Sequence, residues 1–332
     1  MKITVLMGGT SSERNVSLAS GIRIVQALRT KGHKVIALDP AHGVIDAARE
    51  QDLSAGTVGT APPSLESLTK VAEGAFLPNL TTMKEITGAD VVFLGLHGGQ
   101  GEDGTIQALL DMAGVKYTGS GHLSSALAMD KDLSKKLFRA AQVQTADWLM
   151  SPATIEQVEG ILDLPVIVKP SKQGSTVGLT LVKKREDIQP AITEALKYDD
   201  EVMIERFIPG RELTVGVLGD IALPVGEIIP KHEIYDYECK YTAGMAVEVF
   251  PAKISPAATH RVQEQALAAF KSLKLRGCAR IDFRLTTEGE FYCLEANTLP
   301  GMTQLSLIPQ GAAAMGIGFP DLCERIAKLA LD

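Results

Sequence analysis

The sequence predicts an α/β protein, and three observations support this. β-branched segments alternate with helical patterns through the first hundred residues, glycine-rich stretches follow two of those segments, and 45% of the 332 residues are apolar. Such alternation is typical of parallel strands joined by helices. A chain of this length and composition can bury the cores of about two or three domains.

The N-terminal third begins with ITVLMGGTSSER, which we expect to form a strand ending in a glycine-rich loop, and a helix follows over about residues 16–30. Further strands are expected at KVIALDP and in DVVFLGLHGGQGEDG, which again ends in a glycine-rich loop. Because open α/β sheets bind ligands at the carboxyl ends of their strands, we expect the two loops to meet in one crevice.

The middle third opens with a helical pattern, SSALAMDKDLSKKLFRAA, after which strand-rich segments enclose the helix REDIQPAITEALKY. We place a domain boundary near Gly121, and the expected domains are residues 1–121, 122–210 and 211–332. The last of these should contain two strands, a polar aromatic loop, a long helix, two more strands and a closing helix. In order, they are RELTVGVLG, IALPVGEIIP, KHEIYDYECKYTAG, HRVQEQALAAFKSL, CARIDFRLT, EFYCLEAN and DLCERIAKLAL.

Charge and cysteine usage argue against several classes of function. A formal charge of −7 without a long Lys/Arg block argues against nucleic-acid and membrane partners. The N-terminus reaches glycines and a carboxylate too early for a signal peptide, and no 18-residue apolar run follows. The cysteines lack Cys-x-x-Cys spacing, which argues against zinc and a disulfide framework and fits the reducing cytoplasm. They are Cys239, Cys278, Cys293 and Cys323.

The segment KPSKQGSTVG, residues 169–178, holds a lysine, glycines and hydroxyl groups, but its order is not that of a P-loop, whose lysine opens a helix. Its flanks, PVIVK and VGLTLVKK, are β-branched and apolar, so the segment is expected to join two strands. We interpret it as a flap that covers phosphates. The alternative is that Lys169 ends a strand at the surface.

Two apolar segments near the carboxyl end carry a set of polar side chains. Strand alternation places Arg280 and Asp282 on one face of the first segment, and Glu295 and Asn297 on one face of the second. Oxygen ligands from two paired strands suit magnesium, which completes its octahedron with phosphate oxygens and water. A hairpin with one face in solvent would have the same pattern.

The second of these segments runs directly into TLPGMTQLSL, which predicts an irregular turn. Such a turn can present backbone N–H groups, that of Gly301 among them, to a negatively charged oxygen. A turn with no ligand is the alternative.

Eight sequence blocks stand in order along the chain: GGTSSERNVSLASG, HGGQGEDGTIQ, YTGSG, MDK, VKPSKQGSTVG, YDYECKY, GCARIDF and LEANTLPGMTQLSL. Together they resemble the D-alanine:D-alanine ligase family of the ATP-grasp superfamily, in the family's order and over nearly the whole chain. The resemblance implies an ATP-grasp fold. In that fold, an N-terminal parallel α/β domain is followed by two α+β lobes that enclose ATP between antiparallel sheets.

For ATP, the resemblance implies phosphate ligands, contacts to adenine and ribose, and ligands of two magnesium ions, which manganese can replace. By composition alone, carboxylates at these strand edges would simply be solvated. The implied phosphate ligands are Lys131, Lys169 and Lys240. The implied adenine and ribose contacts are Glu205, Phe207, Ile208 and Glu212. The implied metal ligands are Asp282, Glu295 and Asn297.

For the first D-alanine, the resemblance implies that Glu13 holds the ammonium group. Glu13 would also form a hydrogen-bonded set with Ser175 and Tyr241, which closes the loop YDYECKY over the site. His97 matches a histidine near this substrate. Without the resemblance, each feature has a simpler interpretation. Glu13 would be a carboxylate in the first turn of a helix, His97 would be a structural histidine, and the loop would be an exposed turn.

For the ligation step, Arg280 and the Gly301 N–H match the family's stabilisers of a tetrahedral oxyanion. Ser306 and Leu307 match contacts to the second D-alanine. The implied reaction joins two D-alanine molecules through an acyl phosphate, releases ADP and phosphate, and serves synthesis of the bacterial cell wall. Retention of YDYECKY favours the dipeptide over D-alanyl-D-lactate.

The chain departs from the family's pattern at Asn15, Gln100 and Leu305. None of these positions matches a metal or phosphate ligand, so the departures bear on which substrates the site accepts. The resemblance also suggests a homodimer formed through the N-terminal region.

Three alternatives stay open from the sequence. A related carboxylate–amine ligase, or one of the D-alanine:D-lactate type, would keep the ATP site and accept another second substrate. A nucleotide sensor would be expected to lack the metal ligands, which are intact here. A serine hydrolase that used Ser175 and His97 would need Gly-x-Ser-x-Gly, which GSTVG does not supply.

Overall fold

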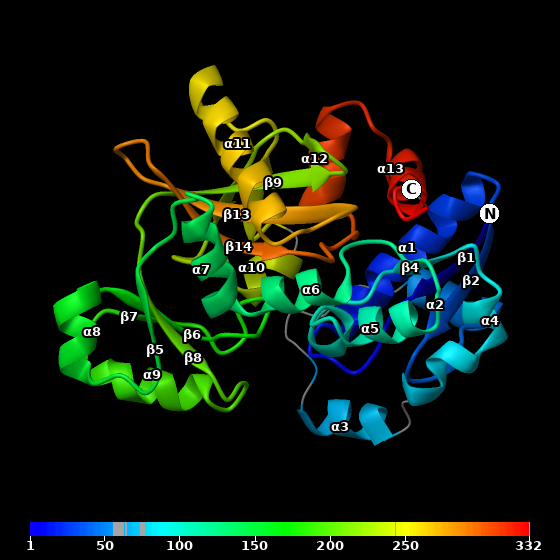
Figure 1. Ribbon diagram of the computed structural model, residues 1–332, viewed down its shortest axis with the longest axis horizontal. Coiled ribbons are helices and arrows are strands. Elements are labelled where there is room, and N and C mark those ends of the chain that lie inside the picture. The colour runs from blue at the N-terminus through cyan, green and yellow to red at the C-terminus, as the bar shows by residue number, and fades with distance from the viewer. Residues whose placement is uncertain (56–62, 64, 74–76, 243, 332) are drawn as a thin grey trace.

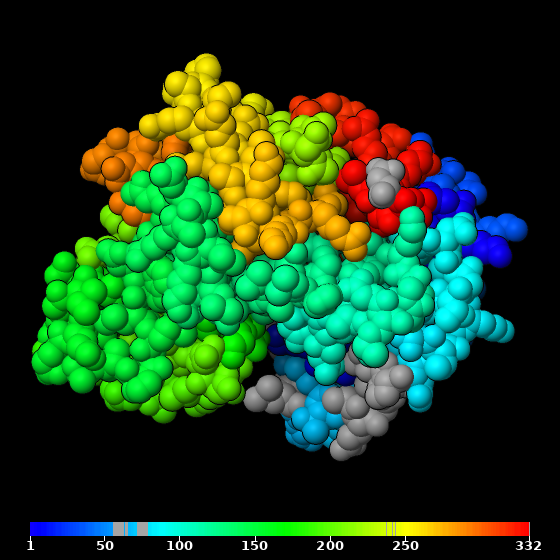
Figure 2. Space-filling model, viewed as in Figure 1, coloured from blue at the N-terminus to red at the C-terminus, as the bar shows by residue number. Residues whose placement is uncertain are grey.

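The computed structural model describes residues 1–55, 63, 65–73, 77–242 and 244–331. Three sheets lie in this part of the chain, and Figure 1 shows the blue N-terminal region at the right, the green central region at the lower left and the yellow to red C-terminal region above. In Figure 2, teal helices bridge the N-terminal and central regions. No helix of the described part is both long and apolar enough to cross a membrane.

The N-terminal sheet has the strand order β3-β2-β1-β4, and β1 is parallel to both β2 and β4. This confirms the parallel α/β arrangement predicted for the first hundred residues. The strands are β1 (Lys2–Leu6), β2 (Lys34–Asp39), β3 (Gly43–Val44) and β4 (Val91–Leu94). The helices are α1 (Arg14–Thr30), α2 (Ala47–Ala55), α3 (Leu65–Glu73), α4 (Lys84–Thr87) and α5 (Thr105–Met112), with 3₁₀ turns η1 (Leu77–Thr82) and η2 (Gly99–Gly101).

The helical pattern that follows forms two helices rather than one, α6 (His122–Met129) and α7 (Lys131–Ala140). The break falls at Asp130, whose backbone is extended and whose side chain accepts a hydrogen bond from Leu133 N. An aspartate N-cap satisfies a free N–H group of the first turn and so favours a new helix start at this position. As a result, Lys131 lies in the first turn of α7.

The central sheet has the order β5-β8-β6-β7, and all its pairings are antiparallel. Strands β6 and β7 are neighbours, which confirms that residues 171–179 join two strands. The strands are β5 (Trp148–Met150), β6 (Val166–Pro170), β7 (Thr180–Val182) and β8 (Val202–Arg206). The helices are α8 (Ile155–Leu162) and α9 (Ile188–Ala195), with the 3₁₀ turn η3 (Arg185–Asp187).

The C-terminal sheet has the order β12-β11-β9-β13-β14, with β10 paired to β9, and it too is antiparallel. Its strands are β9 (Arg211–Leu218), β10 (Ile221–Ala222), β11 (Gly226–Pro230), β12 (Ala246–Val249), β13 (Cys278–Leu285) and β14 (Phe291–Asn297). Its helices are α10 (Tyr237–Tyr241), α11 (Pro256–Ser272), α12 (Leu307–Ala314) and α13 (Phe319–Lys328).

The last helix returns to the N-terminal region. Leu322 and Ile326 of α13 share a buried core with Val25 and Leu28 of α1. The turn that follows β14 also lies against this region, because His97, three residues after β4, contacts Leu299 O at 2.8 Å.

The segment KHEIYDYECKYTAG contains a short helix, α10, where we expected a loop throughout. Asp236 is its N-cap and accepts a hydrogen bond from Cys239 N at 2.9 Å. This cap explains how a polar, aromatic stretch forms a helical turn.

Candidate active site

The candidate site is built around the pairing of β13 with β14. In the observed register, Arg280 lies opposite Asn297 and Asp282 opposite Glu295. This confirms that the four polar side chains share one face of the hairpin. Asp282 accepts hydrogen bonds from Thr214 Oγ1 at 2.7 Å and from Arg280 Nη2 at 2.8 Å. Burial lowers the pKa of Arg280, but Asp282 and Glu295 raise it by more, so the guanidinium stays charged.

The oxygen atoms on this face fit a divalent metal. Within the described chain, buried Asn297 Oδ1 has no hydrogen-bond partner, a costly arrangement unless a ligand completes it. Two residues earlier, Glu295 Oε2 lies 3.5 Å from Lys131 Nζ. Burial raises the pKa of Glu295, but Lys131, Lys240 and Lys169 outweigh it and hold the pKa at about 2. Two carboxylates and an amide oxygen are hard donors of the kind magnesium prefers.

Lys131 and Lys169 point toward the same space from two different elements. Lys131 is buried and donates a hydrogen bond to Gln173 O of the flap at 2.7 Å. Burial lowers its pKa, while Glu295 opposes that shift. At the end of β6, Lys169 donates to Glu205 Oε2 at 2.7 Å. Lys169 is therefore buried and paired, which contradicts the alternative of a surface strand end.

Glu205 is bonded to a second lysine that the sequence analysis did not single out. Lys135 is fully buried and donates to both Glu205 Oε1 and Thr145 Oγ1, the latter at 2.6 Å. Burial raises the pKa of Glu205, but Lys135 and Lys169 together hold it at about 2. A signal did exist in the sequence, because Lys135 lies one helical turn after Lys131 and on the same face of α7.

Lys131, Lys169 and Glu205 line a cavity of about 970 Å³ between the central and C-terminal sheets. Its walls include apolar side chains from both sheets, Ile167 and Leu294 among them, and the flap lies along one side. Phe207, Ile208 and Glu212 also line it. Arg284 contacts two of these residues, because it donates to Ile208 O at 3.0 Å and forms an ion pair with Glu212 at 3.3 Å.

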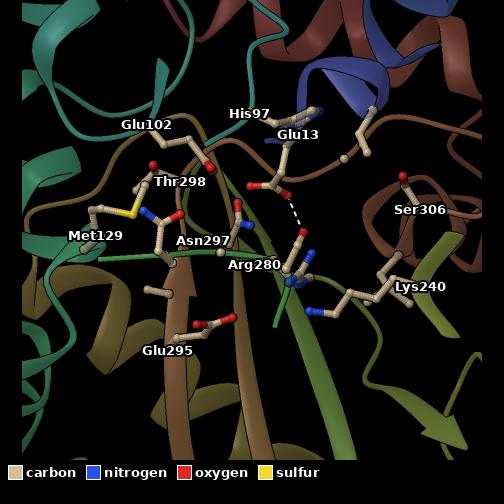
Figure 3. Close-up of a pocket in the computed structure, with 18 of the residues that line it drawn as sticks. Glu13, His97, Glu102, Met129, Lys240, Arg280, Glu295, Asn297, Thr298 and Ser306 are labelled. Carbon is tan, nitrogen blue, oxygen red and sulfur yellow. Dashed lines mark hydrogen bonds between the residues drawn. The ribbon is translucent and has the colours of Figure 1, made fainter. Parts of the chain in front are cut away.

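A second cavity of about 880 Å³ opens beside the first, and the two share Lys131, Lys240, Arg280 and Glu295 in their walls. Figure 3 shows Glu13 and Glu102 entering it from one side, and Glu295 and Asn297 from β14. The second cavity is more polar than the first, and it joins the glycine-rich loops to the metal-ligand candidates.

Glu13 immediately precedes α1, and its carboxylate accepts a hydrogen bond from the Ser175 hydroxyl rather than capping the helix. Ser175 and Thr176 adopt positive φ values of 51° and 60°, which costs about 1 kcal/mol or more for a residue with a Cβ. The flap thus reaches Glu13 in a strained conformation. The Tyr241 side chain, expected in the same set, lies outside the described residues; its backbone ends α10.

His97 is fixed by the surrounding chain. Its Nδ1 donates to Leu299 O at 2.8 Å, and its Nε2 lies 3.1 Å from Ser20 Oγ. Burial lowers the pKa of His97, so the ring is neutral near pH 7. Its hydrogen bonds within the described chain do not include Ser175, which gives no support to a serine hydrolase.

Glu102 is a buried carboxylate that the sequence analysis treated only as part of a loop pattern. It accepts a hydrogen bond from Gly98 N at 2.7 Å and lines the second cavity with Glu13. Burial and the charge of Glu13 raise the pKa of Glu102 to about 8. The site therefore holds a carboxyl group that is mostly protonated at pH 7 together with Glu295, whose low pKa keeps it ionised.

The turn after β14 closes the second cavity. A Cβ atom at Gly301 would lie 2.7 Å from Ser306 Oγ, so a larger residue here would displace the Ser306 hydroxyl group. Ser306 Oγ accepts a hydrogen bond from Thr303 N at 2.9 Å, and Leu307 begins α12. Gly301, Ser306 and Leu307 all line the cavity, as does the exposed Leu305.

The two glycine-rich loops meet, as predicted. The Ser11 hydroxyl donates to His97 O, and Gly8, Gly9, Gly98 and Gly101 line a small shared crevice. The crevice lies at the carboxyl ends of β1 and β4, where the sequence analysis placed it.

Comparison with known proteins gives full-length matches. Residues 2–120 match the family described as D-ala D-ala ligase N-terminus, and residues 131–328 match D-ala D-ala ligase C-terminus. A D-alanine–D-alanine ligase of Geotalea uraniireducens is 42% identical, covering 99% of this chain and 95% of its own. A D-alanine–D-alanine ligase of Pelotomaculum thermopropionicum is 37% identical, and the match covers 100% of this chain and 97% of the relative.

Two solved structures are similar along the whole chain. The D-alanine–D-alanine ligase of Bacillus anthracis has a TM-score of 0.76 at 30% identity, with 100% of this chain and 97% of that chain covered. The VanG D-Ala:D-Ser ligase of Enterococcus faecalis has a TM-score of 0.82 at 29% identity, with 99% and 98% covered.

Proposed function

Because the chain belongs to the D-alanine–D-alanine ligase family and has its ATP-grasp fold, we propose that it joins two molecules of D-alanine at the expense of ATP. The observation that carries this proposal is the pair of connected cavities. A largely apolar cavity of nucleotide size opens directly into a more polar one that contains an ammonium-binding candidate, Glu13. Such a layout lets a phosphoryl group pass from one bound molecule to another.

In this proposal, ATP occupies the cavity between the two antiparallel sheets. Glu205 accepts the adenine amino group, the backbone of Phe207 and Ile208 contacts the ring, and Glu212 binds the ribose. Lys131, Lys169 and Lys240 bind phosphate oxygens. The burial of the first two lysines and their approach from two elements support the assignment, since ammonium groups held in a dry pocket attract phosphate strongly.

Asp282, Glu295 and Asn297 would hold divalent metal, magnesium or manganese. The unsatisfied Asn297 oxygen and the low pKa of Glu295 support this assignment. Metal bound there would offset the phosphate charge that otherwise repels an incoming carboxylate.

The proposed reaction has two steps. A carboxylate oxygen of the first D-alanine forms a bond to the γ-phosphorus, the bond from that phosphorus to the bridging oxygen breaks, and ADP leaves. The amine of the second D-alanine then attacks the carbonyl carbon of the acyl phosphate. Inorganic phosphate leaves with the C–O electron pair and takes up the proton that the amine nitrogen loses. Glu13 pairs with the first ammonium group and so fixes the carboxylate for attack.

The second step passes through a tetrahedral oxyanion, which Arg280 and the Gly301 N–H stabilise. Each such donor is typically worth roughly 3 kcal/mol in the transition state. Ser306 and Leu307 position the second D-alanine, and His97 shapes the first site. Holding both amino acids in reach supplies about 7 kcal/mol or more, so positioning contributes at least as much as charge.

ADP release with a panel of acceptors tests the choice of second substrate. We expect turnover with D-alanine alone, and little with L-alanine, D-lactate or D-serine in place of the second molecule. D-serine belongs in the panel because one structural neighbour is a D-Ala:D-Ser ligase. Turnover only when another acceptor is added would show that the dipeptide assignment is wrong.

We place the product in peptidoglycan precursor synthesis in the cytoplasm, and we expect a homodimer formed through the N-terminal region. The family membership supports these assignments. Sedimentation of the purified protein at several concentrations tests the dimer, because a constant monomer mass would contradict it.

A further inference from the structure

A second cluster of ligating side chains lies on the segment between β11 and β12, outside both cavities. His232, Asp236 and Cys239 bring an imidazole nitrogen, a carboxylate oxygen and a thiol sulfur within 4.8 Å of one another. His232 Nδ1 lies 2.6 Å from Asp236 Oδ2. His232 is exposed, Asp236 is half-buried and Cys239 is buried, so the cluster opens toward solvent at one end.

The fold of the segment and its packing both hold this cluster together. It joins two neighbouring antiparallel strands, and its ends are fixed by the bond from Lys231 N to Met245 O at 2.9 Å. The helical turn of α10 sets the distance between Asp236 and Cys239. Cys239 also packs in a small apolar core with Ile228 and Leu307, which fixes its side of the cluster.

We propose that His232, Asp236 and Cys239 form a binding site for Zn²⁺ or a similar thiophilic divalent metal. Nitrogen, oxygen and sulfur donors at this spacing suit the tetrahedral coordination of zinc, and solvent can supply the fourth ligand. Magnesium, which takes oxygen ligands, does not compete well for a thiolate. The metal replaces the thiol proton and the proton shared by His232 and Asp236, and both are released to solvent.

This site differs from the one that the cysteine spacing argued against. Paired cysteines are absent from both, but here one cysteine is joined by a histidine seven residues earlier and an aspartate between them. A short helix capped by the aspartate brings the three together, and the sequence analysis expected a loop there.

Metal at this site would restrain a segment that covers the nucleotide cavity. Ile234, Tyr235 and Lys240 of the segment line that cavity, and Thr176 Oγ1 of the flap donates to Tyr235 O at 3.4 Å. We expect nucleotide exchange to require the flap and this segment to separate, because both lie along the cavity that we assign to ATP. Zinc is therefore expected to slow turnover, a consequence that rests on the proposed function, whereas metal binding itself does not.

Cobalt substitution tests the binding directly. The full-length protein, freed of metal with a chelator, is titrated with Co²⁺ while the near-ultraviolet thiolate-to-cobalt charge-transfer absorption is recorded. We expect one equivalent to bind and Zn²⁺ to displace it. Cys239→Ala should abolish the absorption, and His232→Ala should weaken cobalt binding by at least about 10-fold.

Two variants serve as matched controls. His260→Ala removes a histidine from another histidine–carboxylate pair, with Glu264, that has no thiol beside it, and Cys278→Ala removes a different buried thiol. Both should keep the absorption. Absence of the band in folded wild-type protein, or its persistence in Cys239→Ala, would overturn the proposal; circular dichroism of each variant verifies the fold.

Inhibition separates this site from the catalytic metal site. At saturating Mg²⁺, low Zn²⁺ should slow ADP release by the wild type, and Cys239→Ala and His232→Ala should need at least about 10-fold more zinc for equal inhibition. Equal zinc sensitivity in all variants would refute the restraint of the covering segment. The cobalt band would still decide whether the metal binds, independently of any ligase activity.

Discussion

Lys169 donates a hydrogen bond to Glu205 at 2.7 Å, so the lysine that we assign to phosphate and the carboxylate that we assign to adenine are joined to each other. When a triphosphate draws Lys169 away, Lys135 is the cationic partner that Glu205 keeps among the described residues. Burial alone favours the neutral carboxyl group. Lys135 is therefore the residue that keeps Glu205 ionised while nucleotide is bound.

Replacing Lys135 with methionine should weaken ATP binding. Without the ammonium group, burial raises the pKa of Glu205, and a protonated Glu205 is a poorer acceptor for the adenine amino group. We expect the KM for ATP to rise about 10-fold or more, equivalent to roughly 1.4 kcal/mol, and to rise further as pH falls. Steady-state kinetics with varied ATP between pH 6 and 9 measure this.

The control for that variant is Lys136→Met, which removes the neighbouring, exposed lysine paired with Asp132. Its KM for ATP should match the wild type at every pH. If the KM of Lys135→Met for ATP equalled that of the wild type and did not change with pH, the role given to Lys135 would be refuted. Unfolding measurements belong beside the kinetics, since removing one partner of a buried ion pair typically costs about 3–5 kcal/mol of stability.

Asn297→Ala should separate metal use from stability. The side-chain oxygen is a proposed metal ligand, so we expect about 10-fold more Mg²⁺ to be needed for half-maximal turnover. The same oxygen is buried without a partner in the described structure, so its removal should leave metal-free stability unchanged or raise it by about 1 kcal/mol. Magnesium titrations of ADP release and chemical unfolding in chelator measure the two effects. A large loss of stability without a change in magnesium dependence would show that Asn297 is structural.

The sequence was informative where a pattern repeats locally. Alternation of apolar residues predicted that Arg280 and Asp282 share a face. The apolar residues that alternate with them must face the core, so the two charged side chains must both face the other way. The predicted helix over 16–30 begins two residues earlier, at Arg14. The apolar pattern did not reveal the break at Asp130 or the turn at Asp236, because in both places an aspartate cap decides where a helix begins.

Contacts between distant segments could not be predicted in the same way. Lys135 and Glu205 are 70 residues apart, and Glu102 acquires its high pKa from burial beside Glu13, on another strand end. No spacing rule joins such pairs; only the packing of separate elements does. The family resemblance supplied Glu205 and Glu13, but Lys135 emerged only from the structure.

Glu13→Gln should impair binding of the first amino acid and spare ATP. The amide keeps an acceptor for the Ser175 hydroxyl but loses the charge that pairs with an ammonium group. A hydrogen bond to a charged group is worth about 1.5–3 kcal/mol, so the KM for the first D-alanine should rise between about 10-fold and 100-fold. The KM for ATP is the internal control. An unchanged KM for D-alanine would place the ammonium elsewhere.

Glu102→Gln should change how stability depends on pH. The carboxyl group has an ordinary pKa of 4.5, and burial followed by the charge of Glu13 raises it to about 8 in the folded protein. Between those values the folded state holds a proton that the unfolded state has lost, so Glu102 makes the protein less stable as pH rises from about 4.5 to 8. Glutamine cannot titrate, yet its oxygen can still accept from Gly98 N. The free energy of unfolding of the variant, relative to the wild type, should therefore increase with pH across this window and level off above it. If the free energies of unfolding of the two proteins changed with pH in parallel, Glu102 would be ionised in the folded state. The assignment of a neutral carboxyl group beside Glu13 would then be wrong.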